Sequence, residues 1–245
     1  MEQNRIIGDI INIEQNSVKN FYNKRIKNIS NISAINLQSD LKLSQNRDSI
    51  EKDVFLLNID LKKFNRILDI GCGIGRVINY IKDFDVVYNG LDISEEAIKK
   101  ASEEYKNYKN FHFQNINITN LEKKDLAIKD SFSLIISMGT LMYVNDNKLN
   151  NLFHIFNELL AKNSMIYIRE SISIMKDRLT LKNFYSEELK SNYSAIYRTK
   201  EEYEELFDRY FIKNNFKLQK SDILLKGNLA NRKETNQMYW IFKRG

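Results

Sequence analysis

Three glycines at alternate positions follow a short apolar run, and this pattern could hold a nucleotide-type cofactor. The motif is ILDIGCGIGR, residues 67–76, in which Asp69 ends the apolar run. Its glycines are Gly71, Gly73 and Gly75. Glycines at such a turn let the backbone take positive φ, and they let a ligand approach the unpaired N–H groups of the helix that follows. A dinucleotide fingerprint has its third small residue one position later, where this chain has Arg76, so the pattern disfavours NAD and FAD.

A second acidic residue ends the next apolar segment, which is GLDISEEAI at residues 90–98. Asp92 comes 21 residues after Gly71. At this spacing an acid reaches the tip of the adjacent parallel strand, where it can accept both hydroxyls of a ribose. Ser94 is placed to cap the helix that follows. The glycine turn and this acid together predict a ribose-containing cofactor, and a glycine turn without a ligand is the alternative.

The pattern Asp-x-Gly-x-Gly-x-Gly resembles motif I of the class I methyltransferases that use S-adenosylmethionine (SAM). The resemblance covers about residues 64–169. It implies SAM as the cofactor and S-adenosylhomocysteine (SAH) as the product. The core residues that it assigns to the cofactor are Asp69, Gly71, Cys72, Gly73, Gly75, Asp92, Ile93, Asn117, Ile118, Met138 and Gly139.

Two of the implied cofactor contacts in the core, and two that precede it, differ from the rest, because each departs from the motif or has another possible role. Asn117 stands where the family has an acid against the adenine, and its amide carbonyl can still accept a hydrogen bond from the exocyclic amine. Cys72, between two motif glycines, also fits the role of a small packing residue. Before the core, Tyr22 and Arg47 resemble helix residues that some small-molecule methyltransferases use to cover SAM and to pair with its carboxylate. A solvated helix face is the alternative for Arg47.

Alternating strands and helices are predicted around these motifs. Apolar runs predict five strands, at 66–70, 86–92, 111–115, 132–138 and 164–169. Helical segments are predicted to start near residues 74, 95 and 147, which is the alternation of a parallel sheet. Two last strands, FKLQKSDILL and QMYWIFKR, end the chain as an antiparallel hairpin. The expected fold class is α/β, with a Rossmann-like, seven-stranded, mostly parallel sheet and helices on both of its faces.

The resemblance implies a single methyltransferase domain over residues 1–245. Its expected parts are a helical N-terminal cap at 1–60, a SAM-binding core at 64–169, a substrate lid inserted after strand five at 170–213, and a C-terminal strand pair at 214–245.

The residues after the fourth predicted strand exclude several classes of methyltransferase. Enzymes that methylate the amino groups of adenine, cytosine or glutamine carry a [DN]-P-P-[YF] tetrad there, whereas this chain has SMGT and contains no proline. Covalent catalysis through a thiol needs a cysteine beside the acceptor, and the single cysteine is Cys72. No HExxH or CxxC motif appears, so no metal is expected. His112 and His154 are isolated and fit packing or surface positions.

Methyl transfer from a sulfonium requires an aligned nucleophile and exclusion of water more than it requires many catalytic groups. Tyr143 is expected near the methyl group, and Glu170 is the candidate for a base or orienting group. The residues expected to bind the acceptor are Arg169, Tyr185, Tyr197 and Arg198. Thr199 and Glu202 form a capping box that places Arg198 just before a helix N-terminus, a position that favours phosphate or carboxylate. A solvated pair of charged helices is the alternative for this segment.

The 245-residue chain carries a formal net charge of +6, with 38 Lys and Arg against 32 Asp and Glu. No dense basic block with interleaved aromatic residues appears, so charge alone does not favour a nucleic-acid partner. The N-terminus lacks a continuous apolar region, no stretch of 18 apolar residues occurs, and one cysteine forms no internal disulfide. We expect a cytoplasmic enzyme without a membrane segment, and the oligomeric state is open.

The expected lid and its flanking segments are similar to bacterial small-molecule methyltransferases of natural-product and surface-polysaccharide pathways, including those for O-methyl phosphoramidate groups of capsules. This resemblance implies O-methylation of a small, anionic, phosphorylated or nucleotide-linked acceptor. Three alternatives stay open: an N- or O-methyltransferase of natural-product biosynthesis, a methyltransferase of RNA or protein, and a SAM-binding module without catalysis.

Overall fold

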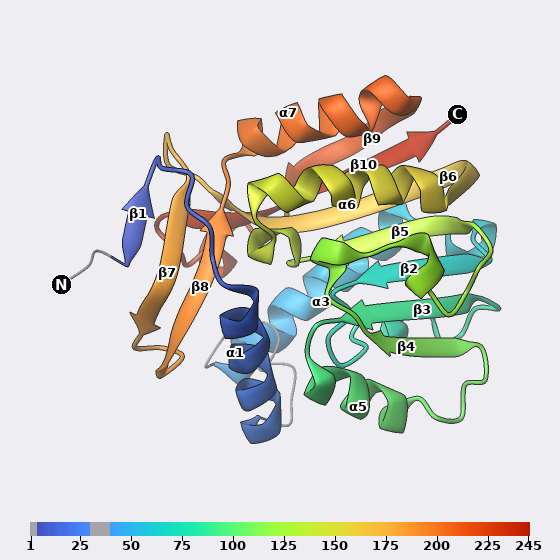
Figure 1. Ribbon diagram of the computed structural model, residues 1–245, viewed down its shortest axis with the longest axis horizontal. Helices are drawn as coiled ribbons and strands as arrows, with labels where there is room; N and C mark the ends of the chain where they lie inside the picture. Colours follow the sequence, from blue (N-terminus) through green and yellow to red (C-terminus); the bar gives the residue numbers. More distant parts are fainter. Residues whose placement is uncertain (1–3, 30–39) are drawn as a thin grey trace.

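The computed structural model describes residues 4–29 and 40–245 of the chain. A seven-stranded sheet forms its centre, and a smaller three-stranded sheet stands beside one edge of it (Figure 1). The strands of the large sheet follow the order β4-β3-β2-β5-β6-β10-β9. Their bounds are Arg66–Ile70 for β2, Val87–Asp92 for β3, Phe111–Asn115 for β4, Phe132–Met138 for β5, Leu160–Ser173 for β6, Phe216–Ile223 for β9 and Thr235–Arg244 for β10.

The strand directions bring the loops that could bind ligands to one edge of the large sheet. Strands β2 to β6 run parallel, so their carboxyl ends meet along this edge. Strand β10 is antiparallel to both β6 and β9 and forms the expected C-terminal hairpin. Thr235 at the start of β10 lies opposite Ser173 at the end of β6, so the chain entering β10 returns to the same edge. The strand order and directions confirm the predicted Rossmann-like α/β fold class.

Helices cover both faces of the large sheet (Figure 1). Helices α3 and α4 pack on one face, α6 and α7 pack on the other, and α5 lies along β3 and β4. Their bounds are Leu41–Asn58 for α3, Ile78–Ile81 for α4, Glu95–Glu104 for α5, Asp146–Leu159 for α6 and Lys200–Tyr210 for α7. Within β2, Ile67 points to the α3 side and Leu68 to the α6 side, because successive strand side chains alternate. None of the helices in the described part of the chain is long and apolar enough to cross a membrane.

The predicted strands agree closely with those observed, but one predicted helix is wrong. Strands β2 to β5 match their predicted ranges to within one residue, whereas β6 is longer at both ends. The helix expected from about residue 74 is reduced to the four residues of α4. Gly71, Gly73 and Gly75 all have positive φ, so the backbone stays in turns through this loop and cannot begin a helix there.

The start of the chain and the segment after β6 together form the small sheet. Strands β7 (Leu179–Ser186) and β8 (Ser191–Tyr197) make an antiparallel hairpin, and β1 (Arg5–Ile7) pairs with β7. The expectation of a helical lead-in is therefore wrong for Arg5–Ile7, where the backbone hydrogen bonds with the β7 edge. Helices α1 (Gln15–Asn28) and α3 fit the expectation. Residues 1–3 and 30–39 of the predicted cap lie outside the described residues.

Helix α7 begins at the predicted capping box but does not form part of a lid. Thr199 Oγ1 accepts from the Glu202 amide at 3.2 Å, and the Glu202 carboxylate accepts from the Thr199 amide at 2.8 Å. Beyond the box, Tyr203 and Phe207 pack against Trp240 of β10, with ring centroids 5.6 and 5.3 Å apart. The alternative of a solvated helix pair is wrong, because the segment forms a hairpin followed by one helix packed on the sheet.

Phe55 anchors α3 to the sheet, and we expect its removal to be costly. It is fully buried, and its ring lies 5.0 Å from Tyr167 and 5.7 Å from Tyr80, measured between centroids. Phe55→Ala should lower the free energy of unfolding in urea by about 3–5 kcal/mol. The control is Leu57→Ala in the same helix, where the side chain is 81% exposed and the change should stay within about 0.5 kcal/mol. Equal losses for the two variants would contradict this packing.

Candidate active site

The glycine loop after β2 is held tightly against the neighbouring strand ends. The Gly71 amide donates to the Leu91 carbonyl at 2.8 Å. Gly71 has φ +75°, and a Cβ built on it would lie 2.0 Å from Oγ1 of Thr140. That hydroxyl donates to the Ile70 carbonyl at 2.9 Å, so Thr140 bridges the ends of β2 and β5. A side chain at position 71 would break this bridge, and glycine is required there.

Asp92 closes the same loop from the end of β3. Its Oδ2 accepts from the Gly73 amide and its Oδ1 accepts from the Ser94 amide, both at 2.8 Å. Burial raises the pKa of this carboxyl above its usual range, while the Ser94 and Gly73 amides act in the opposite direction. The carboxylate and the glycine loop are therefore joined directly, and both face one cavity.

This cavity has a volume of about 370 Å³ and lies at the carboxyl ends of β2, β3, β5 and β6. Its walls are formed by helix α1, the small sheet and the segment 225–237. Eleven of the predicted cofactor and acceptor residues line it besides Asp92 and Tyr143: they are Tyr22, Arg47, Gly71, Gly73, Ile93, Asn117, Ile118, Met138, Gly139, Arg169 and Tyr197. The structure thus brings together most of the residues that the sequence motifs singled out.

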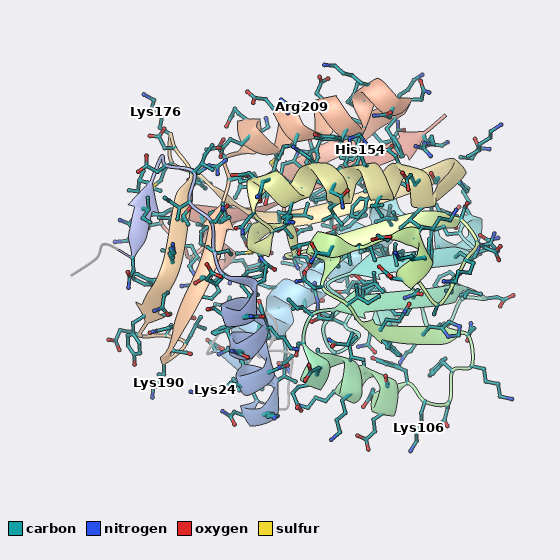
Figure 2. All side chains as sticks on the ribbon, viewed as in Figure 1. Lys24, Lys106, His154, Lys176, Lys190 and Arg209 are labelled. Carbon is teal, nitrogen blue, oxygen red and sulfur yellow. The ribbon has the colours of Figure 1, made fainter. Side chains whose placement is uncertain are left out.

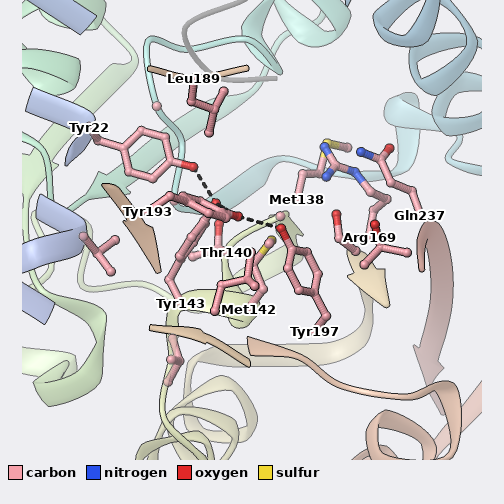
Figure 3. Close-up of a pocket in the computed structure, with 18 of the residues that line it drawn as sticks. Tyr22, Met138, Thr140, Met142, Tyr143, Arg169, Leu189, Tyr193, Tyr197 and Gln237 are labelled. Carbon is pink, nitrogen blue, oxygen red and sulfur yellow. Dashed lines mark hydrogen bonds between the residues drawn. The ribbon is translucent and has the colours of Figure 1, made fainter. Parts of the chain in front are cut away.

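Four tyrosines from three elements form one hydrogen-bonded string across the cavity wall (Figure 3). Tyr22 of α1 donates to the Tyr143 hydroxyl at 2.8 Å. The Tyr143 and Tyr193 hydroxyls lie 3.2 Å apart, and those of Tyr193 and Tyr197 lie 2.9 Å apart. Burial raises the pKa of all four phenols, so they are neutral hydrogen-bonding groups at neutral pH. Tyr193 was not predicted as a site residue.

A buried carboxylate that the sequence analysis missed holds Arg169 at the cavity wall. Glu51 of α3 is 3% exposed; it accepts from Arg76 at 2.5 Å and makes two hydrogen bonds with Arg169, one of them at 3.0 Å. Burial alone would raise the pKa of Glu51, but Arg169 and Arg76 lower it to about 2. Gly139 allows this arrangement, because a Cβ there would lie 2.7 Å from the Arg169 guanidinium.

A family model described as "Methyltransferase domain" matches residues 61–244. The chain belongs to this family of methyltransferase domains. Among its relatives is a protein of Invertebrate iridescent virus 6 named as a methyltransferase, 235L, which is 28% identical over 148 residues. That match covers 59% of this chain and 51% of the viral protein.

Two solved structures show the same fold as this methyltransferase. Phosphoethanolamine N-methyltransferase 1 of Haemonchus contortus, in complex with phosphoethanolamine and SAH, has a TM-score of 0.72 at 19% identity and covers 93% of this chain. Magnesium protoporphyrin IX methyltransferase of Synechocystis PCC 6803, with bound SAM, has a TM-score of 0.60 at 12% identity, over 94% of this chain and 96% of that one. The chain spans about half the length of the viral relative and 48% of the Haemonchus chain. Family and fold confirm the predicted class, the class I SAM-dependent methyltransferases.

Glu170, the predicted base, does not line the cavity. It is fully buried and accepts from three successive amides, those of Thr140 and Leu141 at 2.9 Å and that of Met142 at 3.2 Å. Burial raises its pKa to about 7, and these amides act against that rise. Its role is to hold the turn η4 (Leu141–Tyr143), and we therefore correct its assignment as a base.

Two of the predicted acceptor residues also lie outside the cavity. The Arg198 side chain is fully buried, and its guanidinium donates to Asp146 at 2.7 Å and to the carbonyls of Leu141 and Val144 at 3.0 and 2.7 Å. Because of these contacts, Arg198 stabilises the turn η4 and does not bind the acceptor. Tyr185 is 50% exposed on the hairpin and does not reach the cavity.

Three predicted cofactor residues support the loop from behind instead of facing the cavity. The Asp69 carboxylate accepts from the Tyr88 hydroxyl at 2.7 Å, and burial raises its pKa to about 7. Cys72 is buried against Gly90, and Gly75 packs against Tyr105. Within the described part of the chain no cluster of His, Cys, Asp and Glu could hold a metal ion.

The sequence analysis also missed the segment 225–237, which forms one wall of the cavity. It reaches the site because β10 begins at the edge where the parallel strands end. Arg232, Lys233 and Gln237 are among its lining residues, and Gln237 lies near Arg169 in Figure 3. The antiparallel pair of C-terminal strands was predicted from the sequence. The segment that joins these two strands could therefore have been expected at the edge where the parallel strands end.

Replacement of Asp92 should weaken cofactor binding. We expect Asp92→Ala to raise the Kd for SAH by about 10- to 150-fold, because a buried carboxylate that accepts hydrogen bonds is worth about 1.5–3 kcal/mol. Isothermal titration calorimetry with SAH measures the change. Asp85→Ala, at an exposed position just before the opposite end of β3, is the matched control and should bind as wild type does. An unchanged Kd for Asp92→Ala would remove that residue from the cofactor site.

The Glu51 carboxylate should make stability depend on pH in the acid range. Its pKa is about 2 when folded and near 4.5 when unfolded, so its contribution is complete above pH 4.5 and is lost as the pH falls toward 2. Glu51→Gln should be destabilised at pH 7 by about 3–5 kcal/mol, since two buried guanidinium groups lose their partner. Below pH 4.5 its urea-unfolding free energy should fall less steeply than that of wild type. Asp53→Asn, exposed on the same helix, should follow wild type, and parallel slopes for all three proteins would rule out this role.

Proposed function

We propose that this methyltransferase transfers the methyl group of SAM to a small anionic acceptor. The supporting observation is the charge of the cavity wall beyond the glycine loop. The basic side chains that line the cavity are Arg5, Arg47, Arg169, Arg232 and Lys233. Only two acids, Asp92 and Glu234, line it among the described residues. Three of these arginines also pair with acids, Arg5 with Glu234, Arg169 with Glu51 and Arg232 with Glu188, and the latter two acids lie outside the lining. The side of the wall that faces the cavity is therefore mainly basic, which favours an acceptor with a phosphate or carboxylate group.

The residues that would hold SAM lie at one end of this cavity. Asp92 would accept from the ribose hydroxyls, Asn117 and Ile118 would contact the adenine, and the open backbone at Gly71 and Gly73 would face the methionine part. The fit rests on the glycine loop, whose Gly71 and Gly73 line the cavity, and on a carboxylate already placed at the end of β3. When bound, SAM supplies a methyl group on a positively charged sulfur.

The tyrosine string is the candidate for positioning the acceptor. Tyr143 and Tyr197 both line the cavity, and their neutral phenols can donate to or accept from an acceptor oxygen or nitrogen. Because Glu170 is engaged by the backbone of η4, we assign no general base. A phosphate oxygen, a carboxylate oxygen or a neutral amine needs none, since each presents a free lone pair. The chain's part is then to align the acceptor and exclude water.

The finer proposal is O-methylation of a phosphorylated or nucleotide-linked metabolite in surface-polysaccharide biosynthesis, by a cytoplasmic enzyme of one domain. It rests on the resemblance of the hairpin and its flanking segments to such enzymes. N-methylation, including that of natural products, is the second candidate. The structural likeness to a phosphoethanolamine N-methyltransferase favours it, because phosphoethanolamine joins an amine to a phosphate.

Methylation of RNA is less favoured by the distribution of charge. Basic residues such as Lys24, Lys106, Lys190 and Arg209 point outward in different directions around the molecule (Figure 2). A nucleic-acid surface would gather them on one face. The positive charge that does gather lines the cavity, which is of a size that suits a small molecule.

Methyl transfer from radiolabelled SAM tests this proposal. Calorimetry with SAH first measures cofactor binding; then phosphoethanolamine, phosphorylated sugars and CDP-linked sugars are offered with labelled SAM, each beside its dephosphorylated counterpart. We expect SAH to bind with micromolar Kd and label to enter a phosphate-bearing compound only. Equal labelling of the neutral counterparts would contradict an anionic acceptor. SAH binding without turnover on any pool would favour a module without catalysis, and binding of RNA at low salt would favour the RNA alternative.

A further inference from the structure

The carboxylate of Glu188 is paired with Arg232, an arginine that lines the cavity. Glu188 belongs to the turn between β7 and β8, at the end of the hairpin that lies beside α1 (Figure 1). It forms an ion pair with Arg232 at 2.6 Å, and its side chain is 25% exposed. Its neighbour Leu189 packs against the same buried cluster as Phe21 and Tyr22 of α1, so the turn and the N-terminal helix share one apolar core.

Two further arginines experience the charge of Glu188. Burial lowers the pKa of Arg25 in α1 and of Arg47 in α3, and the Glu188 carboxylate partly offsets this effect for both. Arg232 lowers the pKa of Arg47 as well, which places these two like charges close together. The Arg47 guanidinium is held in place by the Leu229 carbonyl at 3.1 Å and by Asn231 at 2.5 Å. Asn231 and Arg232 are neighbours in the chain, so the Arg47 and Arg232 guanidinium groups belong to one part of the cavity wall, with Glu188 paired to Arg232. An anion is favourable beside such a pair of cations.

The cluster can be reached from the cavity. Arg47 and Arg232 both line it, as does Leu189, whereas Glu188 does not. Glu188 therefore contacts Arg232 from outside the cavity lining, while a molecule in the cavity can contact the same arginine directly. An arginine that faces a ligand site can exchange one carboxylate for a phosphate or another carboxylate with the same bidentate geometry.

We propose that Arg47 and Arg232 form an anion-binding site in the cavity wall, and that the anionic group of a bound molecule competes with Glu188 for it. The ligand chemistry is a phosphate or a carboxylate. It belongs either to the amino-acid part of the cofactor or to the acceptor, and in this the inference rests on the proposed function. Glu188 then acts as an internal competitor that lowers affinity and lets the product leave.

Calorimetry on the full-length protein separates these sources. Glu188→Gln is compared with Glu187→Gln, its exposed neighbour in the same turn, which removes the same charge away from the cluster. Each variant is titrated with SAH, with methylthioadenosine, which lacks the amino-acid carboxylate, and with inorganic phosphate or phosphoethanolamine in the presence of SAH. We expect Glu188→Gln to bind one anionic ligand about two- to tenfold more tightly, and Arg232→Gln to bind the same ligand more weakly.

Tighter binding of SAH but not of methylthioadenosine would assign the site to the cofactor carboxylate. Tighter binding of phosphate or phosphoethanolamine, with SAH unchanged, would assign it to the acceptor. If Glu188→Gln and Glu187→Gln behave alike with every ligand, the inference is overturned. Failure of wild type to bind SAH would instead contradict the proposed function, so the two can be distinguished.

Discussion

The buried Glu51 carboxylate joins three parts of the molecule on which the cavity depends. It connects α3 to Arg76, which follows the glycine loop, and to Arg169 on β6. Two guanidinium groups buried without a partner would cost several kcal/mol, so α3 packs stably only in the position that brings Glu51 between them. The same position places Arg47, four residues earlier on the helix, in the lining of the cavity. One ion-pair cluster thus sets both the packing of the cap and the charge of the site.

The turn η4 shows how charged residues near an active site can serve the backbone. The amides of Leu141, Met142 and the preceding Thr140 donate to Glu170, and the carbonyls of Leu141 and the following Val144 accept from Arg198. Buried backbone groups that are not paired in a helix or sheet need such partners. Glu170 and Arg198 therefore keep Tyr143 in place at the cavity wall. A charged side chain beside a strand end can hydrogen bond to backbone groups or act on a substrate. The residue type alone does not distinguish these two roles.

The chemistry of the cavity follows from the way the two halves of the sheet meet. The parallel strands bring Asp92 and the glycine loop to one edge, and the antiparallel β10 carries the segment 225–237 back to it. The neutral phenols of the tyrosine string line the same cavity (Figure 3). The glycine loop with Asp92, the phenols and the basic side chains of the segment 225–237 thus line one cavity, as the proposed transfer from SAM to an anionic acceptor would require.

The sequence by itself determined the parallel core and the glycine loop and Asp92 that line the cavity. Strands β2 to β5, the glycine turn and Asp92 were readable because each depends on local patterns, namely apolar runs, residues that allow positive φ and a fixed spacing between neighbouring strands. Only the tertiary structure decided which charged residues face the cavity. Glu51 meets Arg169 across 118 residues, Glu170 meets Leu141 across 29, and Arg198 meets Asp146 across 52. No periodic pattern in the sequence predicts burial or pairing over such separations, because these contacts form only when distant elements pack together.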